Sequence, residues 1–350
     1  MATQQRTLYP WLLKDYMAIA SNVIGDRLHH ALLLHGASGL GIEQLVQRLV
    51  ELVHCESPVQ QKACGQCQHC LLHQSHSHAD FYAVQCPEGK AQISIDQIRL
   101  LSKKIQGTGL VSQRRIVVIE SIELMTESAT NALLKILEEP PSHVYFMLST
   151  TKIQNIKPTI ISRCFKVAIA TPDIHKTQAW LNKKAETSVD VNQLSLLGGT
   201  PLNALNAINS GFSQQLSDYI NNLNQLYVSW ANNQLDESFC HGLTLVEHFE
   251  KIQHDKLLDN GVNGLIDVMM RFNQHVLKQQ LQVNQHNTAV VNMLSPELQQ
   301  SLLTIDTNAL LDFSDRLANL KRLSSQNSGV SLSMQLQRNI NVVTQALNNN

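Results

Sequence analysis

Three short, uninterrupted runs of mostly apolar residues set the strongest limit on how this chain can fold. The runs are Ala31–Leu34, Ile116–Ile119 and Val144–Leu148. Strands that are buried on both faces have this character, and they are typical of a parallel sheet covered by helices. Parallel strands need long crossover connections, and the segments between these runs have helical spacing. The chain up to residue 171 is therefore predicted to be an α/β domain with a parallel sheet.

The helices of this domain can be placed from the spacing of their apolar residues. From Ile42 to Val53, and again from Ile93 to Ile105, apolar side chains recur on one helix face. Thr126 is expected to cap a further helix. Pro140 and Pro141 are expected to end that helix, because proline cannot continue the backbone hydrogen bonding.

After about residue 171 the composition changes and no strand pattern remains. Leu, Asn and Gln dominate this part, with helical periods such as Leu310, Leu317 and Leu320. We expect a small helical domain over 172–212 and a larger helical domain over 213–350. Together with the α/β domain at 1–171 this makes three domains, which suits a chain of 350 residues.

The overall charge argues against binding of nucleic acid by bulk electrostatics. The chain has 27 Lys and Arg residues and 28 Asp and Glu residues, which gives a net charge of −1. Its first residues lack the features of a secretory signal, and it has no apolar run of the ~18 residues that a membrane helix needs. We therefore expect a soluble, cytoplasmic protein with no membrane contact.

Four of the seven cysteines stand close together, and their spacing predicts a metal site. They are Cys55, Cys64, Cys67 and Cys70, and the last three make two overlapping C-x-x-C steps. In a reducing compartment such a cluster is typical of tetrahedral Zn²⁺ binding by thiolates. A redox pair would need only two cysteines, and a DNA-binding finger would need more basic residues than Lys62. We predict a closed, structural zinc site.

Several histidines follow the cysteines and could compete as metal ligands. They are His69, His73, His76 and His78. With four thiolates available, we expect them to be surface residues.

A glycine-rich turn between the first apolar run and the first helix has the skeleton of a phosphate-binding loop. Its glycines are Gly36, Gly39 and Gly41. Backbone N–H groups and the helix N-terminus would cradle an anion there. ATP chemistry also needs a Lys and then a Ser or Thr after the last glycine, but Ile42 and Glu43 occupy those positions. We predict a degenerate loop that binds no ATP productively.

The second marker of a P-loop ATPase is also incomplete. The run Ile116–Ile119 is followed by Glu120 and then Ser121, so one acid is present where many working ATPases have two. An acid at the end of a strand is common and alone indicates little. Together with Ile42 and Glu43 it indicates loss of catalysis.

Three further motifs carry a resemblance to a known family. Asn131–Pro141, Thr150-Thr151 and Ile161–Cys164 resemble the AAA+ ATPase domain of bacterial clamp loaders, which serve DNA polymerase III. The resemblance covers about residues 20–210. Loss of the phosphate-binding Lys is similar to the delta-prime subunits of that family. Leu202 stands where the family's later sensor arginine would fall, a fourth departure from a working ATPase.

The resemblance implies a role within a larger assembly. It implies an AAA+ P-loop domain with a zinc module at 55–70, then a helical lid and an all-helical collar. It implies gamma or tau motor subunits and a delta subunit as partners in a heteropentamer of the polymerase holoenzyme, a nucleotidyltransferase complex, which loads the sliding clamp onto primed DNA. The chain alone is expected to show no ATPase activity.

The resemblance also implies a role for Arg163, as an arginine finger given in trans to a motor subunit's ATP. From spacing alone, Arg163 would be an ordinary surface arginine in a salt bridge. Two other functions stay open: an active ATPase motor with an atypical phosphate loop, and a zinc-dependent nucleic-acid-binding module.

Overall fold

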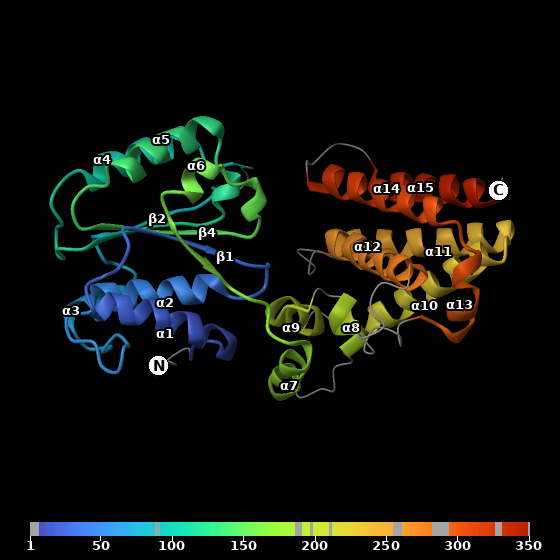
Figure 1. Cartoon of the computed structure of the whole chain (residues 1–350), viewed down its shortest axis with the longest axis horizontal. Coiled ribbons are helices and arrows are strands. Elements are labelled where there is room, and N and C mark those ends of the chain that lie inside the picture. Colours follow the sequence, from blue (N-terminus) through green and yellow to red (C-terminus); the bar gives the residue numbers. More distant parts are fainter. Residues whose placement is uncertain are drawn as a thin grey trace. The chain divides into compact units, whose positions relative to one another are not determined.

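The computed structural model divides the chain into two compact units, residues 1–172 and 173–350 (Figure 1). It describes residues 7–87, 90, 92–185, 191–196, 199–209, 212–254, 261–281, 294–325 and 331–348. Each unit has its own hydrophobic core and is described by itself.

The first unit contains a fully parallel sheet. Among its described residues five strands pair in the order β2-β3-β4-β1-β5. The strands are β1 (Ala31–His35), β2 (Phe81–Val84), β3 (Arg115–Ile119), β4 (Val144–Thr150) and β5 (Phe165–Ala168). The three predicted runs are β1, β3 and β4, which form the centre of the sheet, so the predicted fold class is confirmed.

Helices cover both faces of this sheet (Figure 1). One side carries α1 (Leu13–Ile24), α2 (Ile42–His54) and the short α3 (Gln68–Gln74), and the other carries α4 (Ile95–Ile105), α5 (Glu127–Glu138) and α6 (Pro158–Ile161). Short 3-10 turns occur at η1 (Pro10–Leu12), η2 (Ile122–Leu124) and η3 (Ile153–Asn155).

Alternate residues of the central strand point to the two faces of the sheet. Leu32 and Leu34 pack with α1 and α2, whereas Leu33 packs with α4 and α5. Burial on both faces explains why this strand is apolar from Ala31 to Leu34. The predicted cap of α5 is also present, because the Thr126 side chain accepts a hydrogen bond from the Ala129 N–H at 3.2 Å.

The described residues of the second unit are helical and form no strand, as predicted. The helices are α7 (Ile174–Ala185), α8 (Val191–Leu196), α9 (Pro201–Asn209), α10 (Phe212–Ala231), α11 (Leu235–His254), α12 (Gly261–Gln280), α13 (Pro296–Ser301), α14 (Thr307–Ser325) and α15 (Leu332–Asn348), with a 3-10 turn η5 at Leu302–Thr304. A small cluster of Leu181, Leu194 and Ala204 is separate from the large core. The boundary at residue 212 stays a prediction.

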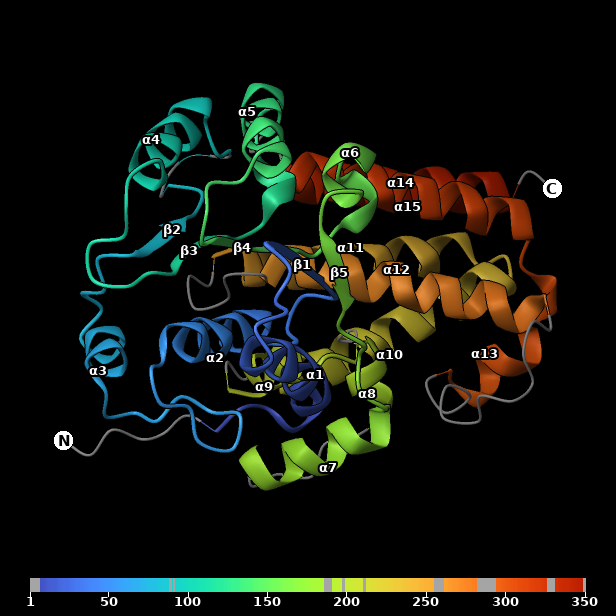
Figure 2. The ribbon, with the colours of Figure 1, turned by 60° about the vertical axis from the view of Figure 1, so that its left-hand side comes forward.

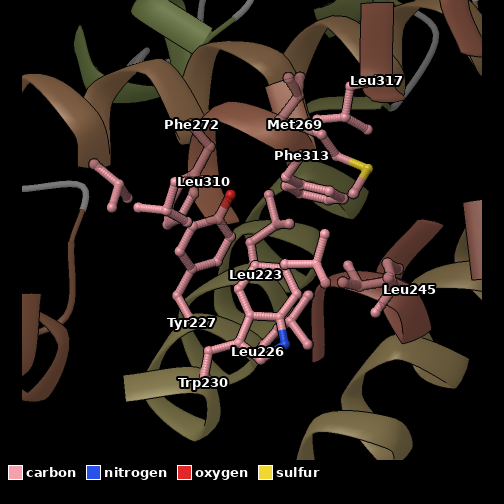
Figure 3. Packing of buried hydrophobic residues seen from close by; sticks show 14 of the residues in the cluster. Leu223, Leu226, Tyr227, Trp230, Leu245, Met269, Phe272, Leu310, Phe313 and Leu317 are labelled. Carbon is pink, nitrogen blue, oxygen red and sulfur yellow. The ribbon is translucent and has the colours of Figure 1, made fainter. Parts of the chain in front are cut away.

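The large core is built around aromatic side chains, among them Tyr227, Trp230 and Phe272 (Figure 3). Trp230 donates its indole N–H to the Thr344 hydroxyl at 2.8 Å, and the Tyr227 hydroxyl lies 2.7 Å from the Asn273 amide oxygen. Asn273, fully buried, donates in turn to the Leu310 carbonyl at 2.8 Å. Because a buried polar group without a partner is costly, these pairs fix how the helices pack.

Candidate functional site

The four clustered cysteines converge in the first unit. One Sγ atom from each of Cys55, Cys64, Cys67 and Cys70 lies within 4.8 Å of the other three. The Sγ atoms of Cys64 and Cys70 are 3.9 Å apart. Tetrahedral thiolates at ~2.3 Å from Zn²⁺ stand roughly 3.8 Å from one another. The cluster therefore has the size and the ligand set of a closed zinc site.

Local structure brings these cysteines together. Cys55 ends α2, Cys67 caps the N-terminus of α3, and Cys70 lies within α3. Gly65 turns the chain between them with a φ of 78°, a conformation that favours glycine. The helix α2 packs against both α3 and α1 (Figure 2).

The surroundings of the sulfur atoms suit thiolates that share a cation. Backbone N–H groups of Gln66 and Cys67 lower the pKa of Cys64 to about 6. Burial raises the pKa of Cys55 and of Cys70 above the ordinary thiol value. A dication between them would offset that desolvation and keep all four deprotonated. The residues present fit Zn²⁺.

The expectation that the neighbouring histidines are surface residues is wrong for two of them. His69 and His78 are each 6% exposed, His73 is half-buried, and His76 is exposed. The helix α3 turns His69 and His73 to the side that packs on α2, where His54 is 3% exposed. His54 was not among the predicted residues, because only the packing of α2 on α3 brings it to the others.

The glycine-rich loop lies between β1 and α2, as predicted from the sequence. Gly39 and Gly41 have φ values of 82° and 75°, and a Cβ at Gly36 would lie 2.8 Å from the Ile169 carbonyl oxygen. Ile42 is 5% exposed and belongs to the core under the loop, whereas Glu43 is exposed. The position that would need a lysine reaching out to phosphate thus holds a buried apolar side chain.

A second carboxylate lies near this loop. Glu120, at the end of β3, accepts a hydrogen bond from the Gln85 side chain at 2.9 Å. Burial, and then the negative charge of Glu43, raise the pKa of Glu120. The loop and the strand end therefore bring two acids together where a phosphate-binding site would need a cation.

Arg163 lies just after α6, with its side chain about one third exposed. Its Nη2 lies 2.6 Å from Glu138 Oε1, and its Nη1 donates to the Thr159 carbonyl at 2.9 Å. The guanidinium is thus at the surface and paired with a carboxylate at the end of α5.

The fold and the site define an α/β domain of the P-loop type, with a four-cysteine metal cluster after its first loop and helix. A family model described as "DNA polymerase III, delta subunit" matches residues 14–173. The delta-prime subunit of Haemophilus influenzae is 31% identical over 281 residues, 80% of each chain. The chain belongs to the DNA polymerase III delta-prime subunit family.

Other similar proteins are also DNA polymerase III subunits. The Escherichia coli delta-prime subunit is 33% identical over 199 residues, which are 56% of this chain and 60% of that protein. A polymerase III gamma subunit of Buchnera aphidicola is 31% identical over 182 residues, 51% of this chain and 49% of its own. None of the described helices is both long and apolar enough to span a membrane.

Proposed function

We propose that this chain is the delta-prime subunit of a DNA polymerase III clamp loader and does not itself hydrolyse ATP. In this role it acts in the cytoplasm, in a heteropentamer with gamma or tau motor subunits and a delta subunit, to load the sliding clamp onto primed DNA. Membership of the delta-prime family supports the assignment, as does the likeness to gamma and tau subunits.

The state of the phosphate loop is the observation that carries the silent-subunit proposal. A working loop needs a Lys for the β- and γ-phosphates and a hydroxyl for Mg²⁺. Here Ile42 is buried in the core and Glu43 lies near Glu120. Two carboxylates repel the phosphates of ATP, and no lysine follows the last glycine of the loop to offset them.

Arg163 is the residue that we propose acts on a partner's nucleotide. A guanidinium keeps its charge at any physiological pH and presents a planar set of donors to phosphate oxygens. The Arg163 side chain is partly exposed, which a contribution in trans requires. Its pairing with Glu138 must then be exchanged for contacts with the nucleotide when the subunits assemble.

The remaining parts have structural roles in this proposal. The cysteine cluster holds a structural Zn²⁺ that orders the 55–70 segment, and the helices after residue 212 form the collar through which the subunits associate. The alternative function, an active ATPase motor with an atypical loop, requires ATP to bind beside Glu43 and Glu120.

Nucleotide binding and turnover of the purified chain, alone and with partners, test the proposal. We expect the isolated chain to bind no ATP at cellular concentrations and to hydrolyse none. Mixed with motor and delta subunits, it should complete an ATPase that depends on clamp and primed DNA. Hydrolysis by the chain alone would show that it is a motor, and failure to complete the complex would remove the clamp-loader assignment.

A further inference from the structure

Four imidazole side chains gather beside the cysteine cluster and take no part in it. They come from α2, from α3 and from the loop before β2, and we call them the histidine cluster: His54, His69, His73 and His78. The rings of His54 and His78 stack with centroids 4.0 Å apart, and those of His73 and His78 with centroids 4.5 Å apart. Such a gathering of basic side chains away from solvent calls for a chemical explanation.

We propose that His54, His73 and His78 bind a divalent transition-metal ion of the Zn²⁺ class, at a second site beside the four-cysteine site. One ring nitrogen from each lies within 4.8 Å of the other two. Imidazole nitrogens suit Zn²⁺, Co²⁺, Ni²⁺ and Cu²⁺. Three such ligands leave a fourth position for water, and the half-buried His73 gives the ion a way in from solvent.

The outer contacts of the cluster resemble those that orient metal-binding histidines. A ligating imidazole typically donates its other N–H to a carbonyl or a carboxylate. His54 Nε2 lies 2.9 Å from the Arg114 carbonyl oxygen, which directs the Nδ1 lone pair inward, 2.7 Å from His73 Nε2. His69 Nε2 lies 3.3 Å from a Glu56 carboxylate oxygen, and its Nδ1 is 3.0 Å from His78 Nε2.

The three proposed ligands are shielded from solvent, since His54 and His78 are buried and His73 is half-buried. Burial, and then the proximity of the other rings, lowers the pKa of His73 to about 4. Burial also lowers the pKa of His78. Neutral imidazoles carry the lone pairs that an ion needs.

A cluster held only by hydrogen bonds is the competing explanation. The Asp80 N–H donates to His78 Nδ1 at 3.2 Å, which in the metal-free ring leaves the proton on Nε2. For an ion to bind at Nε2, that proton must move to Nδ1, which breaks the hydrogen bond from the Asp80 N–H, and the nitrogens of His54 and His73 must separate to the roughly 3.3 Å of tetrahedral imidazole ligands. The two explanations predict different metal contents, so metal binding decides between them.

The test measures the binding of Co²⁺ to tag-free, full-length protein whose cysteine site is already filled with zinc. We expect about one additional ion per chain, with absorption of Co²⁺ bound to nitrogen and no thiolate-to-cobalt charge-transfer band. His73→Gln should remove this ion and keep the zinc, because an amide is a poor ligand. His76→Asn is the matched control, since it removes an exposed imidazole outside the cluster, and it should bind as the parent does.

Three results would overturn the proposal. The first is absence of an additional ion in the parent protein, which would leave a hydrogen-bonded cluster. The second is equal binding by the parent and His73→Gln, which would place the ion elsewhere. The third is a thiolate charge-transfer band for the added ion, which would mean exchange into the cysteine site.

Discussion

At the scale of single residues, the account depends on Arg163, whose carboxylate partner lies on the helix α5. Arg163 is held by Glu138, 25 residues earlier, in a pair of partly exposed charges. Pairs of this kind contribute only ~0–1 kcal/mol to stability. The pair therefore does little for the fold, and the guanidinium is free to change partners at low cost.

Glu138→Gln tests that reasoning. We expect the free energy of unfolding to change by less than about 1 kcal/mol, because the pair is partly exposed. Clamp- and DNA-stimulated ATP turnover of the reconstituted complex should be kept or increased, since Arg163 no longer has to leave a carboxylate. If Glu138→Gln lowered turnover as much as Arg163→Ala, Glu138 would itself be needed for turnover, and the proposed exchange of partners by Arg163 would be contradicted.

Cys67→Ser tests the thiolate site. Removing one of four thiolate ligands should lower Zn²⁺ content to well below about one ion per chain and abolish the thiolate-to-cobalt band after Co²⁺ substitution. Cys240→Ser, an exposed cysteine of the second unit, is the control and should leave both unchanged. Full metal content in Cys67→Ser would mean that the four-cysteine assignment is wrong.

At the scale of elements, the sequence predicted those strands whose own residues form a clear apolar pattern. The runs that became β1, β3 and β4 are buried on both faces, so every residue in them is under the same apolar constraint. The edge strand β5 has Phe165 half exposed and Lys166 in the middle, and β2 is only partly buried, so neither has a distinct pattern.

In the candidate site, too, residues that are close together in the sequence were predicted and residues brought together by packing were not. The convergence of the four cysteines was predictable because they stand close together along the chain, within residues 55–70. His54 and the Glu138–Arg163 pair were not, since only the packing of one helix against another segment brings those residues together.

A buried carboxylate anchors one connection that no sequence pattern indicated. Asp80, fully buried before β2, accepts hydrogen bonds from the backbone N–H groups of Leu110, Val111 and Ser112 at 2.6–2.8 Å. Burial alone would raise the pKa of Asp80, but these donors outweigh burial and lower the pKa below its ordinary 3.8.

Asp80→Asn should therefore destabilise the first unit. An amide cannot accept all three hydrogen bonds and leaves buried donors unpaired, so we expect a loss of roughly 2–3 kcal/mol in urea unfolding at pH 7. The pKa of Asp80 is lower in the folded than in the unfolded protein. Its carboxylate therefore stabilises the fold fully at pH values above the unfolded-state pKa, and this stabilisation is lost as the pH falls through the folded-state pKa. The difference between parent and variant should shrink below about pH 4. A difference in unfolding free energy between parent and variant that does not change with pH would show that the ionised Asp80 carboxylate is not its cause.

At the scale of the whole molecule, the chain combines a P-loop-type domain with an all-helical second unit, each with its own core. The first unit has the glycine loop of a P-loop fold, but Ile42 is buried in the core and Glu43 lies near Glu120. The loop therefore lacks the side chains that bind phosphate in a working ATPase. This combination is what we expect of a subunit whose function depends on its neighbours.

The most direct test of this claim is the ATP turnover of a clamp-loader complex reconstituted with the parent chain or with Arg163→Ala. We expect both complexes to assemble, and the variant to lose the share of clamp- and DNA-stimulated turnover that comes from one motor site, where an arginine finger contributes ~10³–10⁵ in rate. Unchanged turnover in a fully assembled Arg163→Ala complex would contradict the claim that this chain completes a partner's ATP site.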